Sequence, residues 1–264
     1  MAGVTRVHLL CAALVSGWVG LAAGQQDVAD ISSQQLSVAA DPNLSYFLIG
    51  PVAKETPEEG YGLIVVLPGG DGKADSLAFV KRVYKYSLGG KYIVAQPIAV
   101  KWSPQQGIVW PTGSDNLPYV KRTTEQFVDE IIKIVRGQYK INPVRIFTMS
   151  WSSSGPAGYA ISLQNDSPVV GSYIAMSVFK PQKLGPLTQA RGHAYFIEHS
   201  PQDKICPLRM AEEAARLLTA EGARVKFNQY AGGHGWRGNI YPRIAAAIQW
   251  LEQNAQASEP AGEK

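Results

Sequence analysis

The chain has very little cysteine: Cys11 and Cys206 are the only two in 264 residues. Cys11 lies in an N-terminal segment that we expect to be removed, so the mature protein keeps one thiol and cannot form an internal disulfide. Its stability must therefore come from packing. A lone cysteine could be a thiol nucleophile, but no histidine or asparagine pattern frames Cys206, and we expect it to be buried and inert.

Charge is also sparse and is not clustered. Charged residues make up 17% of the chain, and 25 Lys and Arg against 21 Asp and Glu give a net charge of +4. Because the basic residues are scattered, the sequence gives no support for nucleic-acid binding. With 45% hydrophobic residues, the chain can fold around one large core.

One apolar run stands out near the N-terminus, from Leu9 to Ala23, after the positively charged Arg6. Small residues and a polar stretch follow it, which predicts a signal peptide over residues 1–24. The alternative is a membrane anchor, but the run is shorter than the roughly 20 residues that a spanning helix needs. We therefore expect a secreted or periplasmic protein with no stable membrane anchor after cleavage.

From residue 44 onward, short β-branched apolar runs alternate with amphipathic stretches of helical period. This alternation predicts a mostly parallel central sheet with helices on both faces. Residues 44–254 would form one folded domain, after a polar lead-in (25–43) and before a flexible tail (255–264). The expected strands are 46–49, 63–67, 92–96, 145–149, 172–176, 194–199 and 224–230, and the expected helices are 75–86, 124–137, 156–164, 208–221 and 241–254.

The most informative segment is 144–159, where an apolar strand runs through Ser150-Trp151-Ser152-Ser153-Ser154-Gly155 into a helix. In so sharp a turn the middle residue is strained, and the residues two before and two after it must be small. Ser152 satisfies this spacing and is the candidate nucleophile. The other serines of the run are alternatives for the same role, and an ordinary serine-rich loop is the alternative to any catalytic role.

A serine hydroxyl needs a base to take its proton, and His234 in the glycine-rich loop after the last expected strand is the candidate. His193 opens a strand and His199 closes one, so both are interpreted as structural. Asp203, on the loop after strand 194–199, is the candidate acid that orients the histidine. Asp166 follows the serine too closely and Glu198 lies inside a strand.

A serine nucleophile also requires N–H donors for the oxyanion that forms on the substrate. The amide of Ser153 is one candidate donor. The second is expected from Pro68-Gly69-Gly70-Asp71-Gly72, with Gly70 preferred and Asp71 as the alternative. A phosphate-binding loop is excluded here, because the segment lacks the G-x-G-x-x-G spacing and the Gly-Lys-Ser/Thr ending.

Taken in order, these segments resemble the α/β-hydrolase superfamily, and in particular its phospholipase/carboxylesterase, feruloyl esterase and polyhydroxyalkanoate depolymerase group. The resemblance rests on 67–70, 142–147, Ser152, 199–203 and 233–236. It implies an α/β-hydrolase fold and cleavage of carboxylic esters through an acyl-enzyme. It implies no metal and no cofactor, and a small-molecule or polymer-linked ester as substrate. The span between Ser152 and Asp203 holds one expected strand and short connections, which leaves little room for a large lid.

Two departures from that pattern concern the site. Pro68 stands where the group usually has histidine, and Ser150 and Ser154 stand where it usually has glycine. Trp151 and Trp236, which flank the nucleophile and the base, are candidate substrate-binding residues, and Trp102 and Trp110 are weaker ones. Packing in the core is the alternative for these side chains.

Two other functions stay open at the level of the sequence. A serine peptidase of the prolyl-oligopeptidase type has the same order of serine, acid and histidine, although no access-limiting domain is present here. A non-catalytic binding module that kept the fold is the second alternative, which the altered glycines favour and the three spaced catalytic candidates oppose.

Overall fold

The structure, a computed structural model, describes residues 27–39, 41–51 and 55–255. The predicted signal peptide and nearly all of the predicted tail lie outside these residues. Eight strands form one sheet in the order β1-β2-β4-β3-β5-β6-β7-β8, and β2 runs antiparallel to both of its neighbours while all strands from β4 to β8 pair in parallel. The strands are β1 Ser33–Val38, β2 Asp41–Ile49, β3 Tyr61–Leu67, β4 Tyr92–Pro97, β5 Ile141–Trp151, β6 Gly171–Ala175, β7 Ala194–His199 and β8 Arg224–Gln229.

All seven predicted strands are present, within a residue or two of the expected ends or inside longer strands. The prediction of a loose lead-in over residues 25–43 was wrong, because residues 33–38 form β1 and β2 begins at Asp41. β1 is an edge strand with one neighbour, and most of its side chains are exposed or half-buried. A polar edge strand of this kind lacks the apolar signal that reveals the central strands.

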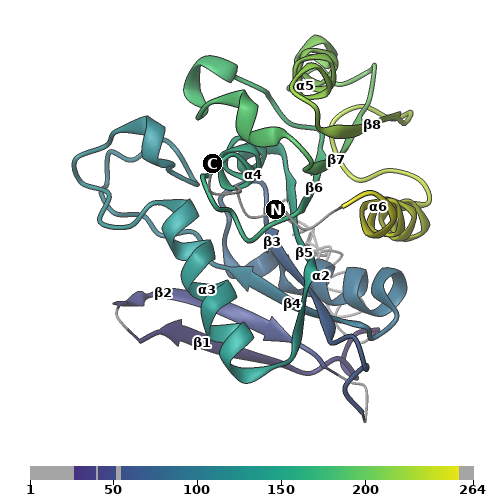
Figure 1. Cartoon of the computed structure of the whole chain (residues 1–264). Helices are drawn as coiled ribbons and strands as arrows, with labels where there is room; N and C mark the ends of the chain where they lie inside the picture. Colours follow the sequence, from purple (N-terminus) through teal and green to yellow (C-terminus); the bar gives the residue numbers. More distant parts are fainter. Residues whose placement is uncertain (1–26, 40, 52–54, 256–264) are drawn as a thin grey trace, which may run out of the picture.

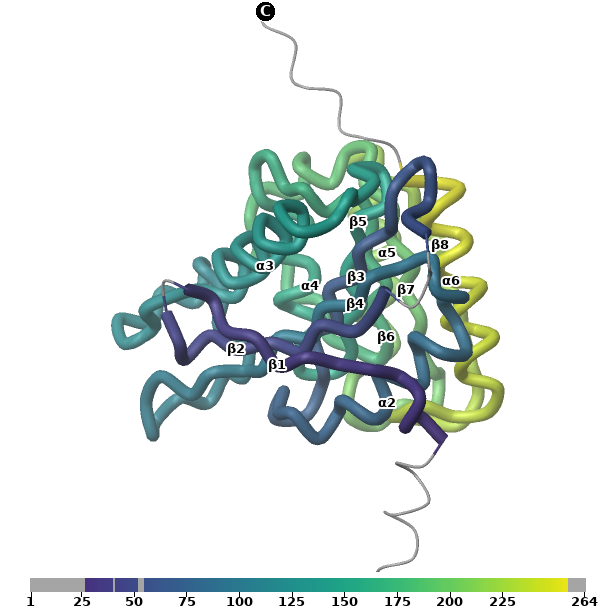
Figure 2. Tube along the Cα trace, turned by 90° about the horizontal axis from the view of Figure 1, so that it is seen from below, coloured from purple at the N-terminus to yellow at the C-terminus, as the bar shows by residue number. Residues whose placement is uncertain are grey.

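Helices cover both faces of the sheet, as the sequence predicted. Figures 1 and 2 show α3 and α6 on opposite sides of it. The Thr123–Gln126 capping box is present at the start of α3, where each side chain bonds the other residue's backbone N–H. The α-helices are α2 Leu77–Val83, α3 Thr124–Gln138, α4 Gly155–Ser162, α5 Leu208–Ala220 and α6 Ile240–Asn254, and the π-helical turn η2 (Tyr84–Leu88) extends α2.

Two faces of the sheet bury separate groups of apolar side chains. One group packs the α2 and α6 side, with Val80, Ile244 and Leu251 against the central strands. A second group packs the α3 and α4 side, with Val128 and Ile131, and a third lies between α4, α5 and strands β6 and β7. β3 is buried along its whole length, because it lies between both layers. Burial on both faces explains why its sequence is apolar throughout rather than alternating.

The strand order reverses at β3. From β3 the chain crosses to β4 on one side, and from β4 it returns to β5 on the other. In an open α/β sheet such a reversal leaves a crevice outside the carboxyl ends of the two strands, and ligands bind there. The segments at those ends are the glycine loop 68–72 and the Ser152 turn, so the topology brings together two regions that the sequence analysis selected separately.

The connection between β6 and β7 spans residues 176–193. Between β6 and β7 the chain forms only two short 3-10 turns, η5 (Pro181–Lys183) and η6 (Leu187–Ala190), which agrees with the prediction of no large lid. Within the described ranges, no helix combines the length and apolar character that crossing a membrane requires.

Candidate active site

Ser152 lies at the tip of the turn between β5 and α4. Its φ is +55°, in the left-handed region that residues other than glycine rarely adopt. Strain of this kind costs about 1–3 kcal/mol and persists only where the surroundings enforce it, most often at functional sites. The conformation is the one the sequence analysis expected for the middle residue of the turn.

The neighbouring serines are either buried or bonded to groups other than the base. Ser150 and Ser154 are both fully buried. The Ser153 hydroxyl donates to the Gly70 carbonyl at 2.8 Å. Of the four serines in the run, Ser152 alone bonds the candidate base, so the geometry favours it over the alternative positions.

The turn accommodates serine at both usual glycine positions. Ser150 fits because Gly158 on α4 faces it: a Cβ at Gly158 would lie 2.4 Å from Ser150 Oγ. Ser154 Oγ donates to the Leu67 carbonyl at 2.6 Å and accepts the Trp151 amide at 3.0 Å, so it ties the end of β3 to the end of β5. The serines at these two positions are therefore accommodated by their surroundings. Ser154 in addition links β3 to β5.

Ser177, on the segment after β6, supports the strained Ser152. Ser177 Oγ donates to the Ser152 carbonyl at 2.6 Å. It reaches that carbonyl because Gly155 leaves the space open, since a Cβ there would lie 1.9 Å from Ser177 Oγ. Nothing in the sequence pattern singled out Ser177, because its role depends on a contact between segments 25 residues apart.

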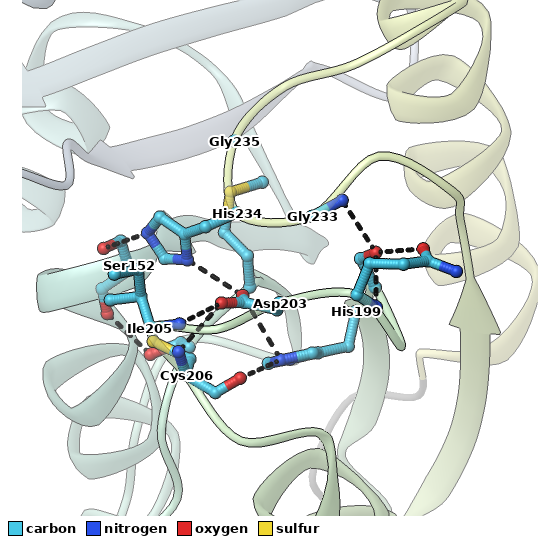
Figure 3. Close-up of polar contacts among 12 residues, drawn as sticks. Ser152, His199, Asp203, Ile205, Cys206, Gly233, His234 and Gly235 are labelled. Atoms are coloured by element: carbon cyan, nitrogen blue, oxygen red, sulfur yellow. Dashed lines mark hydrogen bonds and ion pairs between the residues drawn. The ribbon is translucent and has the colours of Figure 1, made fainter.

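Ser152, His234 and Asp203 form a continuous chain of hydrogen bonds (Figure 3). Ser152 Oγ lies 3.0 Å from His234 Nε2, and His234 Nδ1 lies 2.8 Å from Asp203 Oδ2. A carboxylate accepts only, so Nδ1 carries the ring proton and Nε2 is free to accept the serine proton. The structure thus brings together the three residues that the sequence analysis nominated.

Asp203 is held as a carboxylate. Its side chain is 0% exposed, and Oδ1 accepts the amides of Ile205 at 2.8 Å and Cys206 at 2.9 Å. Burial raises the pKa of Asp203, but the Cys206 amide, the His234 ring and the Ile205 amide lower it more, and the net pKa lies below its ordinary value. Asp203 is therefore ionised at neutral pH and can stabilise a protonated His234.

His199 is structural, as expected, but it also supports the acid. It is 1% exposed, and its Nε2 donates to the Cys206 carbonyl at 2.8 Å while lying 3.4 Å from Asp203 Oδ2 (Figure 3). The ring thereby closes the short loop that carries Asp203. Its position four residues before the acid was visible in the sequence, although the contact was not.

The glycine loop 68–72 lies against the Ser152 turn. At Gly69, a Cβ would lie 2.6 Å from the Trp151 carbonyl, so only glycine allows this approach. The Gly70 carbonyl points toward Ser153, from which it accepts a hydrogen bond. The Gly70–Asp71 peptide is trans, which directs the Asp71 N–H away from Ser153. Gly70 as the second oxyanion donor stays a prediction.

The four tryptophans that are candidates for substrate binding divide into two groups. Trp151 and Trp236 are half-buried and contact each other, with ring centroids 5.7 Å apart, and Phe79 of α2 contacts both. They adjoin Ser152 and His234 in the chain, and their role in substrate binding stays a prediction. Trp110 is 3% exposed and donates to the Pro68 carbonyl, so it supports the glycine loop from inside; Trp102 packs beside the same core.

Only Asp203, Cys206 and His234 could group around a metal ion within the described parts of the chain, with ligand atoms within 4.8 Å of one another. Asp203 and His234 already bond each other. Burial, and then the Asp203 charge, raise the pKa of Cys206 to about 11, which disfavours the thiolate that a metal needs. These residues fit a proton relay better than a metal centre.

Comparison with known proteins identifies the architecture. No protein-family sequence model matches the chain, and no curated protein sequence is significantly similar to it. Among solved structures, it is similar to an esterase from Thermogutta terrifontis at 16% identity, with a TM-score of 0.64 over 90% of this chain and 96% of that one. A bacterial heroin esterase is similar at 15% identity and TM-score 0.64, with 90% of each chain covered.

A third structure, MGS-M1, is an alpha/beta hydrolase from a Medee basin deep-sea metagenome library. It shares 11% identity and a TM-score of 0.61, over 84% of this chain and 97% of that one. The chain has the α/β-hydrolase fold. The expected fold class is confirmed, and in the α/β-hydrolase fold a serine on the turn after the central strand stands at the top of the sheet, as Ser152 does here.

Proposed function

We propose that the protein is a serine hydrolase that cleaves carboxylic esters through an acyl-enzyme intermediate. The observation that carries the proposal is the hydrogen-bonded chain from Ser152 Oγ through His234 to Asp203, with Ser152 at the reversal point of the sheet. The esterases among the structurally similar proteins support an ester as the substrate.

In the first half of the reaction, Ser152 Oγ attacks the ester carbonyl carbon and His234 Nε2 takes the hydroxyl proton. Because Asp203 is ionised and hydrogen bonded to Nδ1, it stabilises the imidazolium that forms. The tetrahedral intermediate then collapses, the alcohol leaves with the proton from Nε2, and the acyl group stays on Ser152.

Negative charge develops on the carbonyl oxygen during that attack. The amide of Ser153 stands at the start of the helical segment that continues into α4, where N–H groups lack intrahelical partners. The Gly70 amide would be the second donor. The positive end of α4 adds to their effect, and each lost donor would cost roughly 10²–10³ in rate.

Water completes the cycle in the second half. His234 takes a proton from the water as its oxygen attacks the acyl carbon, and then returns the proton to Ser152 as the acid is released. The half-buried Trp151 and Trp236 flank this site and would contact the substrate. The site, with no large lid over it, would accept a small-molecule or polymer-linked ester.

Turnover of short p-nitrophenyl esters tests the proposal. We expect hydrolysis by the wild type and a loss of roughly 10⁴-fold or more in Ser152→Ala, because the nucleophile is removed. Ser167→Ala, a serine on the loop after α4, is the matched control and should keep wild-type activity. Hydrolysis of peptide p-nitroanilides but not of esters would favour the peptidase, and a folded wild type without either activity would favour the binding module.

A further inference from the structure

The loop that carries His234 has almost no backbone support of its own. Within the described residues, no backbone-to-backbone hydrogen bond involves residues 231–237. Gly232, Gly233 and Gly235 all have positive φ, of 122°, 78° and 124°. Such a segment is free to take many conformations unless side chains hold it. The position of the imidazole must therefore be set by side chains from outside the loop.

Two N–H groups of the loop donate hydrogen bonds to the segment that carries Asp203. Ser200 Oγ accepts the Gly233 amide at 3.0 Å, and Gln202 Oε1 accepts the Gly232 amide at 3.3 Å. Both acceptors belong to the segment that carries Asp203. These bonds fix one edge of the loop relative to the acid, but they leave the carbonyls on either side of His234 without a partner from that segment.

Those two carbonyls converge on one phenol. Tyr230 Oη lies 3.1 Å from the Gly233 carbonyl and 3.0 Å from the Gly235 carbonyl, and these residues are the direct neighbours of His234. The phenol has one proton, so it donates a shared hydrogen bond to the carbonyl of the residue before the base and to that of the residue after it. Burial, together with the Glu198 and Asp203 carboxylates, raises the pKa of Tyr230 to about 12, so the phenol keeps its proton as a donor.

The ring of Tyr230 is itself fixed by an ion pair whose carboxylate is buried. Tyr230 is 7% exposed, and the Arg243 guanidinium of α6 lies 4.8 Å from its ring centroid. Arg243 Nε donates to Glu198 Oε1 at 3.0 Å, and Glu198 on β7 is fully buried. A charged pair in that position is strongly directional, so it anchors the phenol between β7 and α6.

We propose that Tyr230 is a positioning residue for His234, and that its hydroxyl holds the imidazole between Ser152 and Asp203 by bonding the carbonyls of Gly233 and Gly235. The expected effect on kcat rests on the proposed function. The positioning itself concerns the hydrogen bond between His234 and Asp203, which can be observed without a substrate.

The experiment compares Tyr230→Phe with Tyr195→Phe. Tyr195 is a fully buried tyrosine on β7 whose hydroxyl bonds Ser162 at 2.7 Å, away from the histidine loop. Each variant loses one buried hydroxyl, so both should lose stability. Only Tyr230→Phe should lower kcat on a p-nitrophenyl ester, by about 10- to 100-fold with KM within twofold, because the base is misplaced while the binding surface is intact.

Proton NMR of the His234 Nδ1–H, assigned by its loss in His234→Gln, supplies the readout that is independent of turnover. We expect the resonance in wild type and Tyr195→Phe, and its loss or broadening in Tyr230→Phe. An unchanged kcat and resonance in Tyr230→Phe, or equal effects in both variants, would overturn the positioning role. If the wild type hydrolysed no ester, the proposed function would fail. The Nδ1–H resonance would still show whether Tyr230 positions His234.

Discussion

At the scale of single residues, Asp203 uses its two oxygens for different purposes. Oδ1 accepts two amides of its own loop, and Oδ2 accepts the His234 ring. The first set of bonds fixes the carboxylate, and the second fixes the tautomer of the base. Because the tasks are separated, a substitution that keeps one oxygen can test the other.

Asp203→Asn is that substitution. The amide oxygen can keep the bonds to Ile205 and Cys206, while the NH₂ group faces Nδ1 and forces the ring proton onto Nε2. Nε2 then cannot accept the Ser152 proton, so kcat should fall roughly 10²- to 10⁴-fold with little change in the melting temperature. The measurement is ester turnover together with thermal unfolding, and an active variant would show that the acid does not orient the base.

The nominated residues and their supports differ in how far the sequence could predict them. Ser152, Asp203 and His234 follow from residue type, order along the chain and position after strands. Ser177 and Tyr230 were not predicted, because an ordinary serine or tyrosine becomes significant only through the atom it contacts. His199, which supports Asp203, was noted in the sequence, but there it was given a purely structural role.

At the scale of elements, the turn between β5 and α4 depends on matched small residues. Ser150 of β5 and Gly158 of α4 share one space, since a Cβ on Gly158 would lie 2.4 Å from Ser150 Oγ. The serine in the strand and the glycine in the helix therefore compensate each other. The packing of α4 onto the sheet places the nucleophile turn, so this pair affects the site as well as stability.

A double-mutant cycle measures that compensation. Gly158→Ala alone should lower the free energy of unfolding by about 1–3 kcal/mol through overpacking. In a Ser150→Gly background the same change should be neutral or stabilising, because alanine is the better helix former by about 1 kcal/mol. Denaturant unfolding of the four proteins gives the coupling, and additive effects would mean that the two positions do not share the space.

The element scale also shows where prediction from the sequence stops. The central strands and the five α-helices of the described residues were found because burial on one or both faces leaves a periodic apolar pattern. β1 was missed because it is an edge strand of mostly polar residues that pairs through its backbone. Backbone pairing does not require an apolar pattern in the sequence.

For the whole molecule, His193 links stability to pH. It is 6% exposed, its Nε2 lies 3.1 Å from Ser172 Oγ, and burial lowers its pKa from 6.5 to about 3. The folded state therefore keeps the ring neutral, while the unfolded chain binds a proton below pH 6.5. Stability is full above that pH and falls as the pH is lowered toward 3.

Denaturant unfolding as a function of pH tests this linkage. From pH 6.5 to pH 4.5 the wild type should lose about 2–3 kcal/mol more than His193→Gln, at about 1.4 kcal/mol per pH unit for one proton. Groups such as Asp203 titrate in both proteins and cancel in the comparison. Parallel pH curves for the two proteins would show that His193 is not held neutral.

The central claim is that Ser152 is a nucleophile activated by His234. Its most direct test is covalent labelling with a fluorophosphonate, followed by intact-mass and peptide mass spectrometry. The account predicts one adduct per wild-type chain, located on Ser152, slower labelling of His234→Ala, and no labelling of Ser152→Ala. A folded wild type that takes up no label, or an adduct on a serine other than Ser152, would contradict it.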